Sequence, residues 1–165
     1  HYLLGLCYYE NIEGEKKDLQ PLIIALKEFN FVIENYPSTD FALDAKFKIG
    51  LINDVLASKE MYLGRHYIKK EKWIPAIKRF QNIIKNYSET VYIEEALHRL
   101  VEVHYRIGLK NESNKYAKLL GYNYKSSEWY EKSYKILNKD YKLKIISIDT
   151  KDKKKRIIQK FKRLF

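Results

Sequence analysis

The segment ALKEFNFVIENYPSTDFALDA, residues 25–45, is followed 51 residues later by AIKRFQNIIKNYSETVYIEEA, residues 76–96. A shorter third copy, NYKSSEWYEKS at residues 123–133, follows the matching part of the second by 37 residues. The chain therefore contains an internal repeat. Aligned without gaps, the first two segments are identical at eight positions, and most of their differences are conservative: Ala25/Ala76, Lys27/Lys78, Phe29/Phe80, Ile33/Ile84, Asn35/Asn86, Tyr36/Tyr87, Thr39/Thr90 and Ala45/Ala96.

The apolar residues of this chain recur with the period of a helix. In the first copy, steps of three and four residues predict one face of an amphipathic helix: Leu22, Ala25, Leu26, Phe29, Val32, Ile33 and Tyr36. We expect Ser38 or Thr39 to cap the next helix, with Asp40 in its first turn. Residues 141–148, YKLKIISI, are expected to form an extended linker. Breaks at Gly, Pro, Asn and Ser predict an all-α chain of seven or eight helices: about 1–12, 18–36, 39–70, 72–87, 90–108, 111–122, 126–138 and 151–164.

Small and large residues are spaced in a way that resembles the tetratricopeptide repeat. That repeat places small residues where two antiparallel helices approach closely, and large residues beside them. We therefore predict a tetratricopeptide-like helical-repeat solenoid over residues 1–138, since a helix pair of this kind buries its apolar face only by stacking on neighbours. A generic helical bundle would have to treat the alignment as coincidence. The spacing is present in two copies: Leu63, Gly64, Tyr67, Ala76 and Phe80, and earlier Leu4, Gly5, Tyr8, Ala25, Phe29 and Pro37 with an insertion of roughly eight residues.

The 51-residue offset is longer than the roughly 34 residues of a plain tetratricopeptide unit. The sequence therefore predicts an additional helical stretch, DAKFKIGLINDVLASKEM at residues 44–61, between the first and second units.

The positive charge of the chain is concentrated at its C-terminal end. The formal net charge is +11, and residues 139–165 hold eleven Lys or Arg against three Asp or Glu, so this basic C-terminal extension carries +8. Five apolar residues of the extension share one predicted helical face, which indicates a basic amphipathic helix. It could cap the repeat stack, contact a partner or contact anionic lipid. Its charged surface consists of Lys153, Lys154, Lys155, Arg156, Lys160, Lys162 and Arg163.

No residue pattern in the chain points to a catalytic, cofactor or metal site. The histidines lack metal-ligand spacing, and Glu94 and Glu95 are predicted in a first helical turn, where acids favour the helix dipole. The single cysteine, Cys7, lacks the small preceding residue and apolar leader of a lipid-attachment site, and we expect it to be a buried helical residue. The N-terminus carries no targeting segment, so the sequence is typical of a fragment of a longer protein.

Several segments together resemble the BamD (YfiO/ComL) family of outer-membrane assembly lipoproteins over about residues 1–138. The most characteristic stretches are NYPSTDFALDA, LINDVLASKEMYLGRHYIKKEKW and LGYNYKSSEWY. The resemblance also covers residues 1–12, Asp18, Gln20, 25–84 and 115–137.

This resemblance implies a non-enzymatic scaffold of the β-barrel assembly machinery in a Gram-negative periplasm, without cofactors or nucleic acid. The full-length protein would be lipid-anchored to the inner leaflet of the outer membrane, and the basic extension could also touch the membrane surface. Its C-terminal repeats would bind the POTRA domain of BamA that lies nearest the barrel. Other Bam lipoproteins would also bind, and unfolded outer-membrane proteins would be bound mainly by N-terminal repeats absent here.

The family's basic residue for the POTRA contact corresponds to Arg79 in AIKRFQ, and a guanidinium fork suits a carboxylate. From the sequence alone, Arg79 could instead be a surface charge in an i,i+4 pair.

Two other functions fit the same sequence. One is a periplasmic tetratricopeptide coordinator of envelope synthesis or division. The other is a peptide or nucleic-acid adaptor that binds through its basic tail.

Overall fold

A computed structural model describes residues 1–10 and 18–138 of the chain. This part is all-helical, has no strand and contains seven helices, which confirms the predicted fold class. The predicted linker at 141–148, the tail helix at 151–164 and the charged tail residues 153–163 lie outside the described residues and stay predictions. The helices are α1 (Tyr2–Glu10), α2 (Gln20–Asn35), α3 (Asp40–Lys69), α4 (Trp73–Asn86), α5 (Ile93–Arg106), α6 (Lys110–Asn123) and α7 (Glu128–Leu137).

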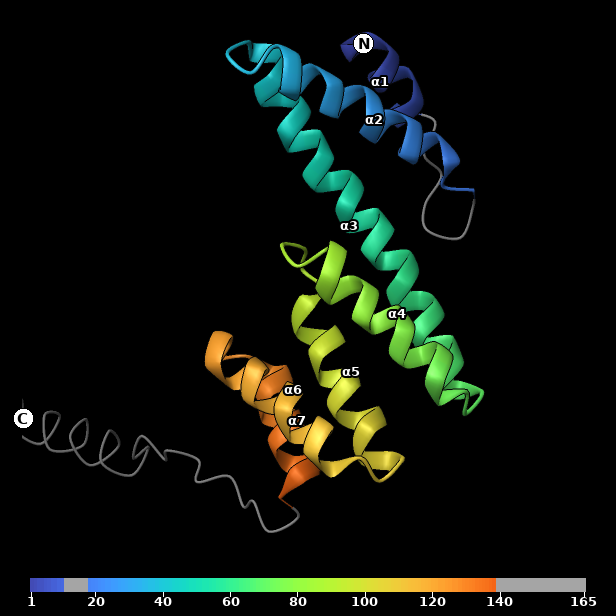
Figure 1. Ribbon diagram of the computed structural model, residues 1–165, viewed down its shortest axis with the longest axis vertical. Coiled ribbons are helices and arrows are strands. Elements are labelled where there is room, and N and C mark those ends of the chain that lie inside the picture. The colour runs from blue at the N-terminus through green and yellow to red at the C-terminus, as the bar shows by residue number, and fades with distance from the viewer. Residues whose placement is uncertain (11–17, 139–165) are drawn as a thin grey trace, which may run out of the picture.

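The helices form a curved stack in which each packs against the next along the chain, and α7 also packs on α5 (Figure 1). The long helix α3 connects the two ends of this stack. Its first part packs with α1 and α2, and its second part packs with α4 (Figure 1). The predicted extra stretch at 44–61 is thus the middle of one continuous 30-residue helix that serves both units. This shared helix is the physical cause of the 51-residue offset.

The repeated Asn-Tyr segments form the same turn three times. In each, the tyrosine N–H bonds to a carbonyl four residues earlier, and the hydroxyl residue three positions later donates its N–H to the tyrosine carbonyl at 3.1–3.2 Å. Thr39 is the N-cap of α3, as its Oγ1 accepts from the Ala42 N–H at 3.3 Å. The sequence repeat is therefore a repeat of hydrogen bonding, in Tyr36–Thr39, Tyr87–Thr90 and Tyr124–Ser127.

The predicted small residues lie where neighbouring helices touch. A Cβ atom added to Gly5 would lie 2.7 Å from Phe29, and one added to Gly64 would lie 2.5 Å from Phe80. Both phenylalanines are fully buried. Real Cβ contacts are never this short, so each glycine is needed to admit the ring of the next helix.

In the third unit, the large and small residues exchange places. The positions 37 residues after Gly64 and Phe80 hold Val101 and Ala117, both of which are buried on the packed pair α5 and α6. The position equivalent to Ala76 holds Ser113, whose buried hydroxyl donates to the Val101 carbonyl at 2.9 Å. The larger residue of the pair thus lies on the first helix in this unit and on the second helix in the preceding one.

The predicted burial of Cys7 is wrong, because the residue is exposed on α1. The buried position of α1 is Gly5. Two residues on, an α-helix has turned by roughly 200°, so Cys7 lies on the opposite side from the contact with α2.

Candidate partner-binding site

Arg79 lies on α4 beside a surface groove between α4 and α3. The local sequence positions it there, since Ala76 and Phe80 turn the buried face of α4 toward the core and leave Arg79 at its margin. The groove has a volume of about 440 Å³. Its lining combines charged, amide and apolar side chains: Glu60, Tyr67, Ile74, Pro75, Lys78, Arg79 and Asn82.

Arg79 is paired inside the molecule with Glu60 of α3. Its Nη1 donates to Glu60 Oε1 at 3.1 Å and to Oε2 at 3.3 Å. The alternative of an intramolecular surface pair therefore holds, but its i,i+4 spacing is wrong, since the acid lies on the preceding helix. The Glu60 side chain is 14% exposed, whereas that of Arg79 is 38% exposed. Glu60 therefore anchors one end of a guanidinium that still faces solvent and carries further N–H donors.

The charge of Glu60 also affects Tyr87, in the repeated turn that follows α4. Burial, with a further contribution from the Glu60 charge, raises the pKa of Tyr87 above its ordinary value. The phenol of Tyr87 therefore stays neutral at pH 7.

A second group of charges, which sequence reasoning missed, joins α3 to α5. Both oxygens of Glu95 accept from Arg65 of α3, one of them from Nε at 3.0 Å. The same carboxylate pairs with Arg99, which also donates to Glu102 at 2.8 Å, and Arg106 donates to Glu102 at 2.8 Å. In the sequence, the alternating acids and arginines at 95, 99, 102 and 106 indicate ion pairs along one face of a helix.

The acids Glu94 and Glu95 do lie in the first turn of α5, as predicted. Their side chains are nevertheless committed to neighbours, because Glu94 accepts from the Ser127 hydroxyl at the start of α7. This arrangement makes them structural links between helices. Within residues 1–10 and 18–138, no group of three His, Cys, Asp or Glu side chains could hold a metal ion.

His98 connects α5 to α7 in the core. Its Nδ1 lies 2.8 Å from the Ser133 hydroxyl, and its ring lies 5.2 Å from that of Trp129. Burial lowers the pKa of His98 to about 4, helped by the nearby charges of Arg99 and Lys132 and opposed by Glu102 and Glu95. His98 is therefore neutral in the folded protein at pH 7.

We expect His98 to destabilise the fold as the pH falls. The folded pKa of about 4 lies below the ordinary value of 6.5, so stability is full above 6.5 and is lost as the pH falls from there toward 4. At about 1.4 kcal/mol per pKa unit, the loss is up to about 3 kcal/mol. Urea denaturation of the wild type and His98→Gln at pH 7, 5.5 and 4.5 checks this. Equal pH dependence in both would contradict it.

The stacked helices, repeated turns and glycine–aromatic contacts define the class of this protein as a tetratricopeptide-like helical-repeat protein. Comparison with known proteins places it more closely. The family model described as "YfiO: Outer membrane lipoprotein" matches residues 1–120. The chain belongs to this family, which confirms the resemblance found in the sequence.

Curated relatives include outer membrane protein assembly factors BamD of several bacteria. The chain is 42% identical to that of Rickettsia prowazekii (strain Madrid E) over 137 residues, which are 83% of this chain and 55% of the relative. It is 40% identical to that of Caulobacter vibrioides (strain ATCC 19089 / CIP 103742 / CB 15) over 137 residues, 83% of this chain and 45% of the relative. The chain thus spans about half the length of the curated relatives it matches. No helix of the described ranges is both long and apolar enough to cross a bilayer.

Proposed function

We propose that this chain is part of a scaffold for outer-membrane protein assembly in the periplasm, which binds the POTRA region of BamA. Family membership over residues 1–120 carries the proposal. A lipid anchor outside this chain would hold the full-length protein at the inner leaflet of the outer membrane. Other Bam lipoproteins would share the assembly, and unfolded outer-membrane proteins would be handled mainly by preceding repeats.

The groove at Arg79 supports this proposal with a specific contact. A POTRA carboxylate can accept from the solvent-facing N–H groups of Arg79, while Glu60 holds the guanidinium in place through Nη1. Bidentate arginine–carboxylate pairs are among the stronger charged contacts in proteins. Ile74 lies beside the pair as an exposed apolar residue. An interface needs both kinds of contact, because apolar surface packed around a charged pair excludes water from it.

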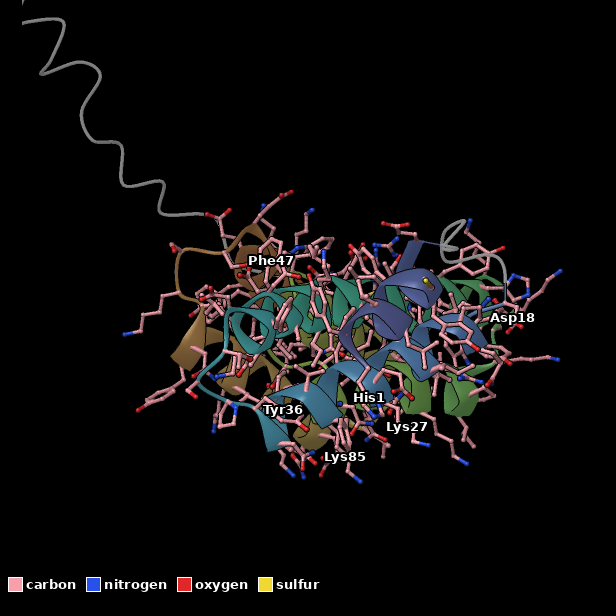
Figure 2. The ribbon with its side chains drawn as sticks, turned by 90° about the horizontal axis from the view of Figure 1, so that it is seen from above. His1, Asp18, Lys27, Tyr36, Phe47 and Lys85 are labelled. Carbon is pink, nitrogen blue, oxygen red and sulfur yellow. The ribbon has the colours of Figure 1, made fainter. Side chains whose placement is uncertain are left out.

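We expect Arg79→Glu to weaken binding to the cognate BamA POTRA domains at least tenfold, about 1.4 kcal/mol. The new carboxylate would repel both Glu60 and the partner acid. Isothermal titration calorimetry with purified POTRA domains measures the change. Lys85→Glu is the matched control, since Lys85 is an exposed cation on the same helix, at the edge of the molecule (Figure 2), and outside the groove.

The charge swap Arg79→Glu with Glu60→Arg separates a partner contact from a purely internal role. The swap restores the internal ion pair, but it places a carboxylate at position 79, where a partner acid would meet a like charge. We expect the swap to unfold at the wild-type denaturant concentration and still to bind weakly. Wild-type affinity in the swap variant would assign Arg79 an internal role only.

A further inference from the structure

The last two helices of the described stack border another open cavity, larger than the groove at Arg79. It lies between α6 and α7 and has a volume of about 610 Å³. Its residues differ in kind from those of the groove at Arg79, because three tyrosines and two lysines make up half of its lining and no acid is among them. The residues that matter here are Lys118, Tyr122, Lys125, Tyr130, Tyr134 and Leu137.

A glycine shapes the aromatic wall of this cavity. A Cβ atom added to Gly121 would lie 2.5 Å from Cε2 of Tyr130, so the ring rests directly against the backbone of α6. Tyr130 in turn packs edge-to-face with Tyr134 at 5.6 Å between ring centroids. The backbone approach on one side and the ring contact on the other hold Tyr130 in position. The wall is therefore formed before any ligand binds, which lowers the cost of binding.

Tyr122 stands at the edge of the cavity with 85% of its surface exposed. A large ring exposed to this degree contributes little to folding, because it buries almost no area. Tyrosine is enriched at the centres of protein interfaces, where its ring packs and its hydroxyl stays hydrogen-bonded. Tyr122 therefore has the properties of an interface residue and not those of a core residue.

The charged side chains that line the cavity are all cationic. Lys118 and Lys125 are exposed, and neither forms an ion pair within the described ranges, whereas nearby lysines do. Lys115 pairs with Glu112 at 3.9 Å and Lys132 with Glu128 at 2.5 Å, so these two acids of α6 and α7 already have cationic partners. An apolar, aromatic hollow flanked by two unpaired cations is complementary to a segment that combines carboxylates with an apolar side chain.

We propose that the cavity between α6 and α7 docks an acidic segment of a partner protein, with an apolar or aromatic side chain against the tyrosines and a carboxylate toward Lys118 and Lys125. Residues 153–163 of this chain include seven Lys or Arg, so by charge an acidic partner segment is more complementary to the cavity than this basic stretch is. A hollow also favours a protruding side chain over a flat bilayer. This surface is independent of the proposed POTRA contact on α4.

The test uses the full 165-residue chain and a fluorescein-labelled peptide of Glu-Phe-Glu-Gly repeats. Fluorescence anisotropy measures the binding of the peptide. A peptide with lysine in place of glutamate has the same apolar content and the opposite charge. We expect the acidic peptide to bind more tightly, and Lys118→Glu with Lys125→Glu to weaken binding at least tenfold. Tyr122→Ser should weaken binding at least threefold and leave thermal unfolding unchanged.

Lys27→Glu with Lys85→Glu is the matched control. These exposed lysines belong to α2 and α4, point outward (Figure 2) and lie outside the cavity, and their reversal changes the net charge equally. Attraction to the basic tail is therefore the same in both double variants. An equal loss in both would overturn the proposal, as would equal binding of the two peptides. Lysine-dependent binding to phosphatidylglycerol vesicles without peptide binding would also overturn it. Arg79→Glu should leave peptide binding intact, which separates this result from the POTRA experiment.

Discussion

Replacing Phe80 by alanine is expected to lower the free energy of unfolding by about 3–5 kcal/mol, as for other buried phenylalanines. Phe80 is fully buried against Gly64 of α3 and belongs to the core cluster formed with Met61, Ala96 and Leu100. That cluster joins α3, α4 and α5. The glycine has no side chain that could move into the space left by the ring. The resulting cavity would therefore persist, and its cost adds to the lost burial.

Phe47→Ala is the control for this change. Phe47 lies on α3 at the molecular surface (Figure 2) and is 67% exposed. The same substitution there should change the free energy of unfolding by no more than about 0.5 kcal/mol. Urea denaturation followed by circular dichroism at pH 7 measures both variants. A loss for Phe80→Ala as small as that for Phe47→Ala would mean that the glycine–aromatic contact does not hold the repeat together.

Much of this fold could be predicted from the sequence because its repeat is built from local contacts. The turns at Tyr36–Thr39 and Tyr87–Thr90 use hydrogen bonds between residues three or four positions apart. Such bonds leave a direct trace in the spacing of residue types. The contact of Gly64 with Phe80 joins two helices that are consecutive in the chain and connected by a short loop. The tetratricopeptide spacing therefore predicts it.

Hydrophobic periodicity could not predict the buried face of α1, although the repeat spacing marked Gly5 as a position of close approach. Its sequence YLLGLCYYE is apolar on all sides, so no periodicity marks which side is buried. In the structure, the close approach of Gly5 to Phe29 and the packing of Tyr2 and Tyr9 against the same ring set the orientation of the helix. The expectation for Cys7 failed because hydrophobicity was the only information available at that position.

The ion pairs of the site depend on contacts between helices that sequence spacing does not reveal. Arg79 meets Glu60 because α3 and α4 run antiparallel with a particular register. Several acids and bases on these helices could have paired equally well by charge alone. The candidate contact at Arg79 therefore came from resemblance to a family, whereas its internal partner required the structure.

Replacing Glu95 by lysine is expected to cost about 3 kcal/mol or more in the free energy of unfolding. Glu95 is buried and accepts hydrogen bonds from Arg65 of α3 and Arg99 of α5. A lysine there would place a third cation between two guanidinium groups. Reversing one member of a buried ion cluster leaves uncompensated charge away from water, and breaking such pairs costs about 3–5 kcal/mol. The partial exposure of both arginines puts the expectation at the lower end of that range.

The control and the salt dependence of this change distinguish electrostatics from packing. Glu89→Lys makes the same charge change at an exposed position in the Tyr87–Thr90 turn and should cost no more than about 0.5 kcal/mol. Glu95→Gln should fall between the two, because the amide oxygen still accepts from an arginine. Raising the NaCl concentration from 0.1 to 1 M shortens the screening length from about 10 to 3 Å. It should therefore recover part of the loss in Glu95→Lys, measured as the shift in urea midpoint. A loss no larger than that of Glu89→Lys would show that the charges between α3 and α5 do not hold these helices together.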